Sequence, residues 1–235
     1  MLEKPISLIP TSELKKSSRV RDVKRFLQAA NLDRNERYFR WVSTFNRDAK
    51  NELYTNEFKE TVKSQNPSSV LDEWFAKANG SGILDATLLT DQMTYLPNDL
   101  LVKVDIATMA NSLEARSPFL DHKVIEFAAS LPENLKMQRF ETKSLLKKVA
   151  ARLVPREVIY RRKMGFGVPI GNWFRGEMKG FVRDILLSEK SLKRGIVKPE
   201  TVEKYVREHT NAERDHAAQI WSLLMLELWF RKFID

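Results

Sequence analysis

The residues best suited to chemistry lie between Arg161 and Gly180. Five of the eight glycines of the chain fall in this stretch, and three consecutive cations, Arg161, Arg162 and Lys163, open it. A glycine-rich backbone can approach a ligand closely, and clustered cations favour an anion. The stretch therefore predicts an anion site, although an ordered connector whose basic groups face water explains the same composition equally well.

A second group of charged residues lies in the stretch from Tyr95 to His122. Here we expect a helix that begins near Pro97 and is apolar on nearly every side from Val102 to Ala110, and such a helix is normally buried. Asp105 lies inside the apolar run, where an unpaired carboxylate would be costly. We therefore expect Asp105 to have a cationic partner, and the candidates are Lys103, Arg116 and the basic loop near Lys163.

Both ends of this helix carry sequence signals. Pro97 suits a first helical turn, and Asp99 suits the positive end of the helix dipole. Asp99 also stands four residues before Lys103, the better orientation for a surface ion pair. Pro118 predicts the end of the helix because it disfavours the α conformation at Ser117.

Other familiar constellations are missing from the sequence. The three histidines, His122, His209 and His216, have no acid-rich cluster around them, whereas a metal site needs three or four convergent ligands. We therefore predict structural or solvent-facing histidines and no metal site. Gly80-Ser81-Gly82 follows a predicted helix and lacks the P-loop lysine, which argues against a phosphate loop.

Length and composition limit the class of protein. A chain of 235 residues can form one well-buried core or at most two small ones. The lack of cysteine excludes disulfides and thiolate metal sites and fits a cytoplasmic protein. No apolar run approaches the roughly 18 residues of a membrane span, so we expect no membrane partner.

The formal charge of +9 invites a nucleic-acid interpretation. The basic residues are, however, mostly spread among acids along amphipathic helices, as on a solvated surface. Only the run after Arg152 is locally lopsided. The charge pattern therefore argues against a nucleic-acid partner.

Apolar periodicity predicts a mainly α fold, a compact multi-helix bundle of about a dozen helices of mixed length. Asp33, Thr55 and Asp121 are suited to cap helices, and residues 1–10 should form an extended arm. No stretch predicts a strand. The expected helices fall near residues 18–30, 34–45, 48–53, 55–62, 70–78, 83–96, 97–117, 121–131, 142–153, 155–159, 181–187, 199–206 and 220–233.

Two motifs in this chain resemble those of glutamine-dependent asparagine synthetases of the B type. The first is YLPNDLLVKVD…MANSLEARSPFLDH, within residues 95–122, and the second is YRRKMGFGVPIGNW, residues 160–173. Both stand in the order of that family's C-terminal region. The resemblance extends from roughly Arg34 to the C-terminus.

The resemblance implies a fold and an activity. The family's glutaminase domain releases ammonia, and its synthetase domain uses ATP and Mg to adenylate the side-chain carboxylate of aspartate. Ammonia then displaces AMP and leaves asparagine. By this likeness, residues 1–235 are the helical C-terminal part of an adenine-nucleotide α-hydrolase-like synthetase domain without its parallel sheet.

Several family features have no counterpart in this chain. They are the Ser-Gly-Gly-x-Asp-Ser loop for pyrophosphate, the N-terminal cysteine nucleophile and an acidic Gly-Asp-Glu segment. The glutaminase domain and the nucleotide-binding loop are thus absent. We expect the isolated chain not to be catalytic and to bind ATP weakly or not at all, because a phosphate cradle is missing.

The resemblance also suggests roles for individual residues. Lys163 matches the family lysine that faces pyrophosphate and the reacting acyl centre, and Lys103 matches a basic position near the phosphates. Asp99 lies at or beside an acidic active-site position. The remaining matches, Glu114, Arg116 and Asp121, are interpreted with Asp105 as residues that support the site, mainly through ion pairs.

Three hypotheses follow for the function. The favoured one is part of an ATP-dependent amide ligase whose substrates are aspartate, ATP and glutamine-derived ammonia. The second is a related amidotransferase or cyclase with another acyl substrate. The third is a helical interaction module that has lost catalysis. Expected protein partners are a missing N-terminal half or further copies of the chain.

Overall fold

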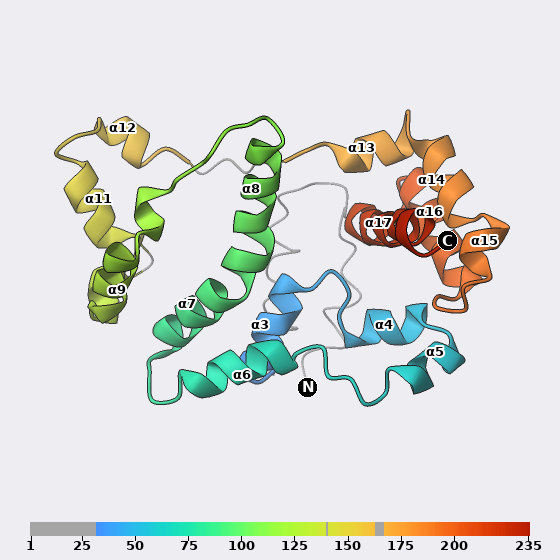
Figure 1. Ribbon diagram of the computed structural model, residues 1–235, viewed down its shortest axis with the longest axis horizontal. Helices are drawn as coiled ribbons and strands as arrows, with labels where there is room; N and C mark the ends of the chain where they lie inside the picture. Colours follow the sequence, from blue (N-terminus) through green and yellow to red (C-terminus); the bar gives the residue numbers. More distant parts are fainter. Residues whose placement is uncertain (1–31, 140, 163–166) are drawn as a thin grey trace. The chain divides into compact units, whose positions relative to one another are not determined.

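The structure is a computed structural model, and it describes residues 32–139, 141–162 and 167–235 (Figure 1). The predicted arm at residues 1–10, the predicted helix at 18–30 and Lys163 lie outside the described residues. The chain divides into two units, Met1–Ser68 with Gly167–Asp235 and Ser69–Phe166, and each is considered by itself.

The described residues are mainly helical, which confirms the predicted fold class. None of the described helices is both long and apolar enough to cross a membrane. The helices of the first unit are α3 (Arg34–Val42), α4 (Arg47–Leu53), α5 (Asn56–Thr61), α13 (Ile170–Arg175), α14 (Lys179–Leu186), α15 (Glu189–Leu192), α16 (Pro199–Thr210) and α17 (Ala217–Phe233).

The core of this unit forms where α13, α14, α16 and α17 pack together, drawn in orange and red in Figure 1. The two largest fully buried side chains of this unit are Phe174 and Leu53. Helix α4 is joined to α16 because the Leu53 carbonyl accepts the Lys198 N–H at 2.7 Å. The core cluster consists of Leu53, Phe174, Val182, Leu186, Val202, Tyr205, Val206, Ile220, Leu223 and Leu224.

The second unit has smaller helices and a short hairpin. Its elements are α6 (Ser69–Lys77), α7 (Ile83–Met93), the π-helical turn η1 (Leu96–Leu101), α8 (Val102–Met109), the 3₁₀ turn η2 (Pro118–Leu120), α9 (His122–Ser130), α10 (Glu133–Lys136), β1 (Met137–Gln138), β2 (Glu141–Thr142), α11 (Ser144–Ala150) and α12 (Arg156–Ile159).

The hairpin corrects the prediction that the chain has no strand. Strands β1 and β2 are two residues each and antiparallel, with Met137 opposite Thr142. Lys143, directly after β2, has a left-handed backbone with φ of 57° and so starts α11 in a new direction. Strands this short carry no apolar period that a sequence could reveal.

The start of α7 is held by residues far along the chain. Glu133 accepts the N–H of Asp85 at 3.2 Å, so a side chain of α10 caps α7. Lys136, also on α10, forms an ion pair with Asp85 at 2.6 Å. These two contacts link α10 to the start of α7. The buried apolar side chains of the second unit lie mainly on α6 and α7.

Candidate functional site

Asp99 lies in the π-helical turn η1 between α7 and α8 (Figure 1). Such turns hold an extra residue relative to an α-helical turn and occur frequently at functional sites. Pro97 has no N–H to donate, and polar side chains add hydrogen bonds to backbone carbonyls around the turn. Asn98 donates its side-chain N–H to the Thr94 carbonyl at 2.8 Å, and Thr94 donates its hydroxyl to the Thr90 carbonyl at 2.6 Å.

Lys103 lies one turn further on, at the start of α8. Asp99 and Lys103 are both exposed, and the described side chains form no ion pair between them, contrary to the predicted surface pair. The spacing rule for such pairs assumes an α-helix. The π turn has more residues per turn, so residues four apart are no longer in register on one side of the helix.

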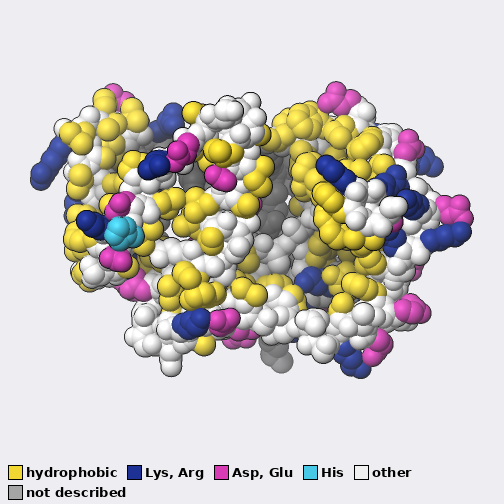
Figure 2. Space-filling view, viewed as in Figure 1, with side chains coloured by type: hydrophobic (Ala, Val, Ile, Leu, Met, Phe, Trp, Pro, Cys, Tyr) yellow, Lys and Arg dark blue, Asp and Glu magenta, His cyan; other side chains and the backbone are white. Residues whose placement is uncertain are grey.

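Helix α8 also departs from its predicted burial. The described part of the chain buries no residue of α8, and Ile106 is 64% exposed. Hydrophobic side chains reach the surface over this helix in Figure 2. We define the α8 surface as the exposed apolar side chains Leu101, Val102, Val104, Ile106 and Met109.

Asp105 is exposed, and no basic side chain of the described residues forms an ion pair with it. The predicted partner is therefore missing for a simple reason: a carboxylate in water does not need one. The apolar run of α8 predicts a buried helix, and that prediction holds only if residues outside the described ones cover α8.

The charged elbow after α8 is partly as predicted. Arg116 donates to Glu114 at 2.7 Å, and both side chains are exposed, so the pair contributes little to stability. Asp121 forms no ion pair among the described residues. It instead accepts the N–H of Lys123 at 2.9 Å and caps α9.

Lys163 lies outside the described residues, but the chain that leads to it is described as far as Arg162. Tyr160 lies between two cations: Lys147 Nζ is 5.4 Å and the Arg156 guanidinium carbon 5.3 Å from the centre of its ring. Arg161 and Arg162 are exposed. The described approach to Lys163 is thus strongly cationic.

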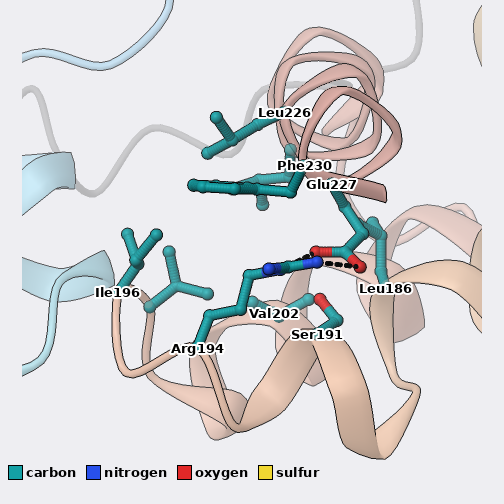
Figure 3. A pocket seen from close by; sticks show the side chains of 10 residues that line it. Leu186, Ser191, Arg194, Ile196, Val202, Leu226, Glu227 and Phe230 are labelled. Atoms are coloured by element: carbon teal, nitrogen blue, oxygen red, sulfur yellow. Dashed lines mark hydrogen bonds and ion pairs between the residues drawn. The ribbon is translucent and has the colours of Figure 1, made fainter. Parts of the chain in front are cut away.

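A small cavity in the first unit is lined by the turn after α15 and by side chains of α14, α15, α16 and α17, which Figure 3 shows as sticks. The Arg194 guanidinium lies against the ring of Phe230, 4.4 Å from its centre, and donates to Glu227 at 2.5 Å. The cavity volume is only ≈ 20 Å³, about what one water needs. Because both charges are paired, we interpret it as structural.

A larger, open cavity of ≈ 510 Å³ lies along α4 and α5. No pattern in the sequence indicates this cavity, since its lining comes from helices whose charges look like a solvated surface. Burial and the nearby charge of Arg47 lower the pKa of Lys50 there. Two of the cavity's four cations are neutralised, because Arg47 pairs with Glu36 and Lys63 with Glu60, both at 3.1 Å.

The described residues do not form a metal centre. No three of their histidine, aspartate or glutamate side chains gather closely enough to hold an ion. The predicted site residues Asp99, Lys103, Asp105, Glu114, Arg116 and Asp121 all belong to the second unit. Asp99 and Lys103 lie on one continuous helical segment, whereas Glu114 and Arg116 lie in the elbow behind it.

Comparison with known proteins gives consistent matches. A family model described as asparagine synthase matches residues 5–231. The chain is 34% identical over 181 residues to asparagine synthetase (glutamine-hydrolyzing) 1 of Bacillus subtilis (strain 168), an alignment that covers 73% of this chain and 28% of that protein. No solved structure matches.

Other relatives carry similar names. A putative asparagine synthetase (glutamine-hydrolyzing) of Mycobacterium bovis is 38% identical over 146 residues, 62% of this chain and 22% of that protein. Asparagine synthetase (glutamine-hydrolyzing) of Rattus norvegicus is 32% identical over 116 residues, 45% of this chain and 20% of that protein. The chain thus spans less than a third of the length of these relatives.

Proposed function

The chain belongs to the asparagine synthase family, and from that premise we propose that residues 1–235 are the helical C-terminal part of a synthetase domain. In the complete enzyme, ATP adenylates the side-chain carboxylate of aspartate, and ammonia released from glutamine displaces AMP to give asparagine. The match covers 28% of the Bacillus subtilis relative, so most of the catalytic machinery comes from outside these residues.

The observation that carries this proposal is the α8 surface. It is apolar and uncovered by the described residues, and it directly follows the turn that bears Asp99. Contiguous exposed apolar patches of this kind usually mark a protein interface. The occupant we propose is the nucleotide-binding part of the synthetase, which would then lie beside Asp99 and Lys103.

The cationic residues have a defined task in this reaction. When a carboxylate oxygen of aspartate attacks the α-phosphorus of ATP, the bond to pyrophosphate breaks and negative charge collects on the leaving group. Lys163 and Lys103 stabilise this charge, because preformed cations are most effective in a site from which water is excluded. Asp99 orients groups at the same site.

Magnesium and ATP are required by the complete enzyme in this proposal. The described residues do not fit a metal site, so no step is assigned to a metal on this chain. ATP binding is likewise assigned to the missing part. The isolated chain is therefore expected to be inactive, since it supplies cations and positioning groups without a phosphate cradle.

A chimera tests the proposal. This chain replaces the segment that it matches in the Bacillus subtilis relative, and asparagine formation is measured with ATP, magnesium, aspartate and ammonium. We expect synthesis by the chimera and none by the 235-residue chain alone. Substitution of a different carboxylic acid for aspartate as the acyl substrate in the same assay tests the related amidotransferases.

Glutamine hydrolysis and a cooperative thermal unfolding transition of the chimera serve together as the folding controls, because hydrolysis alone reports only the glutaminase domain. A chimera that hydrolyses glutamine but forms no asparagine, even with ammonium supplied, would contradict the proposed activity. It would favour the helical interaction module instead.

A further inference from the structure

Three helices of the first unit meet around the buried ring of His209, which is 1% exposed. His209 lies in the last turn of α16, and its Nε2 is 2.9 Å from the carbonyl oxygen of Gly171 in α13. Its Nδ1 accepts the backbone N–H of His216, just before α17, at 3.1 Å. One imidazole therefore links α16 to α13 and to the start of α17.

These two contacts define the protonation state of the ring. A nitrogen that accepts an N–H must have a free lone pair, so Nδ1 carries no proton. Nε2 faces a carbonyl oxygen, which can only accept, so Nε2 carries the hydrogen. His209 is thus neutral, with its hydrogen on Nε2, and both polar atoms of the buried ring are satisfied.

We propose that His209 is a pH-sensitive clasp: its neutral form holds the start of α13 and the start of α17 to α16, and protonation releases α17. A proton on Nδ1 would face the His216 N–H, and two donors cannot bond each other. The clasp at Gly171 would remain, because Nε2 keeps its hydrogen in either state.

The charged groups around the ring oppose one another. Arg175 of α13 and His216 disfavour a proton on His209, whereas Asp215, whose Oδ1 is 3.5 Å from Nδ1, favours it. Asp215 is partly engaged elsewhere, since it accepts the N–H of Ala217 at 3.1 Å. Burial outweighs its attraction, and the pKa of His209 is lowered.

Arg175 strengthens this bias. Its Nη1 is buried and has no hydrogen-bond partner among the described residues, while Nη2 donates to Asn172 at 3.1 Å. A guanidinium whose charge is incompletely compensated beside His209 raises the cost of a second positive charge there.

The partner residue His216 is itself held in place, so its backbone N–H stays directed at His209. Its ring stacks on Tyr205 with 4.6 Å between ring centres. Its Nε2 lies 2.6 Å from Glu208 Oε2. Burial raises the pKa of Glu208, but the hydrogen bond and charge of His216 more than offset this, and the net shift is downward.

The direction of the pH effect follows from the lowered pKa of His209. The unfolded chain binds a proton on this histidine near its ordinary pKa of 6.5, while the folded chain resists it. The contribution of the clasp to stability is therefore complete above that value and is lost as the pH falls below it. Glu208 acts in the same direction at lower pH, below its ordinary value of 4.5.

Histidine-labelled NMR spectra of the 235-residue chain test the protonation state without any substitution. We expect the hydrogen of His209 on Nε2 at neutral pH and its protonation below pH ~6.5. Hydrogen exchange of the His216 amide, corrected for its intrinsic rate, should accelerate about tenfold or more as the clasp opens.

Two variants separate the clasp from general acid sensitivity. His209→Asn keeps an oxygen that can accept the His216 N–H, but this oxygen does not titrate. Exchange of the His216 amide in this variant should therefore no longer accelerate when the pH is lowered from neutral to below 6.5. His122→Asn is the matched control, because His122 is exposed on α9 and lies in the other unit. It should respond like the unsubstituted chain.

A hydrogen found on Nδ1 at neutral pH would overturn the proposal. So would an exchange rate of the His216 amide that rises equally with acid in the His209→Asn variant and in the unsubstituted chain. If His209→Asn fails to fold, the labelled spectra of the unsubstituted chain still decide the matter.

Discussion

Arg162 and Lys163 are adjacent cations, and their substitution separates a catalytic charge from a general basic surface. In the chimera, Lys163→Ala should lower asparagine formation by about two orders of magnitude or more, the scale for removing one group that stabilises a developing negative charge. Arg162→Ala should cost less, because an exposed guanidinium contributes mainly to the surrounding potential.

The assay supplies ammonium directly, so that changes in glutamine hydrolysis do not enter the rate. Near-normal synthesis by the Lys163→Ala chimera would remove this lysine from the mechanism. Equal losses for both variants would reduce it to one of several basic residues.

Asp235 has the most strongly shifted carboxyl in the described chain, and it gives a prediction about pH. The hydrogen bonds from Arg194, the shorter 2.6 Å long, lower its pKa to about 2. A lowered pKa adds stability above the ordinary value of 3.8, and that stability is lost as the pH falls toward 2. Asp235→Asn should therefore lower the free energy of unfolding at neutral pH, by an amount that shrinks below pH 3.8.

Urea unfolding of both proteins over a range of pH measures this difference. Asp184→Asn is the matched control, since Asp184 is an exposed carboxylate of the same unit. A difference for Asp235→Asn that stays constant down to the lowest pH would show that the carboxylate charge does not stabilise the fold.

At the scale of elements, the N-terminal cap of α9 distinguishes structural from catalytic acids. Asp121→Ala should destabilise the chain by about 1 kcal/mol, whereas Asp121→Asn should be nearly neutral because asparagine caps equally well. Asp105→Asn should change stability by no more than about 0.5 kcal/mol, since Asp105 is exposed. Chemical denaturation measures all three.

Equal effects of Asp121→Ala and Asp121→Asn would mean that Asp121 acts through its charge, as an ion-pair elbow requires. That result would restore the interpretation that the sequence motif first suggested.

Local signals in the sequence predict how many of these elements begin. Asp33, Thr55 and Asp121 were each expected to cap a helix, and each accepts a backbone N–H at the start of α3, α5 and α9. Such caps depend on one side chain and the three residues after it. They can therefore be recognised without knowledge of tertiary contacts.

The end of α8 shows what local signals miss. The predicted end at Pro118 is wrong, because the helix stops at Met109. Ser112 has a left-handed backbone with φ of 57°, and the Leu113 N–H bonds to the Thr108 carbonyl at 3.0 Å. This is the usual left-handed end of a helix, but it normally uses glycine. Serine gives no warning of it.

The sequence could predict which residues belong to the candidate site but not how their side chains are oriented. The sequence motif singled out Asp99 and Lys103, but the π turn that sets their orientation leaves no period of its own. His209 was expected to be either a structural or a solvent-facing histidine. Its hydrogen bonds depend on how the helices pack, because Gly171 is 38 positions away from His209 in the sequence and His216 is seven positions away.

Ile106 tests the proposed interface at α8. In the chain alone, Ile106→Glu should alter stability by no more than about 0.5 kcal/mol, because the side chain is already exposed. In the chimera the same change should strongly lower asparagine formation, because it would bury an unpaired carboxylate against the rest of the synthetase.

Lys63→Glu, an exposed charge change in the other unit, serves as the control and should affect neither measurement. An Ile106→Glu chimera with normal synthesis would show that α8 remains exposed in the complete enzyme.

At the scale of the whole molecule, the two units differ in how much they bury. Among its described residues the second unit buries four apolar side chains, Leu71, Phe75, Ala78 and Ala86. The first unit has the ten-residue cluster around α14, α16 and α17. Because stability depends on buried apolar area, the second unit should unfold first.

Two optical signals can detect this order. The helical far-UV circular dichroism reports both units, whereas four of the five tryptophans, all but Trp74, belong to the first unit. We expect the dichroism to begin to fall at a lower urea concentration than the fluorescence changes. Coincident transitions would indicate a single cooperative unit.

The described residues leave α8 uncovered, and this exposure also affects how the protein would be degraded in a cell. Exposed Val104, Ile106 and Met109 present the kind of surface that chaperones retain and proteases remove when a subunit has no partner. The survival of these residues in a cell would then depend on whether the rest of the proposed synthetase covers α8. The exposed apolar side chains of α8 would therefore mark for removal any chain in which the rest of the synthetase does not cover this helix.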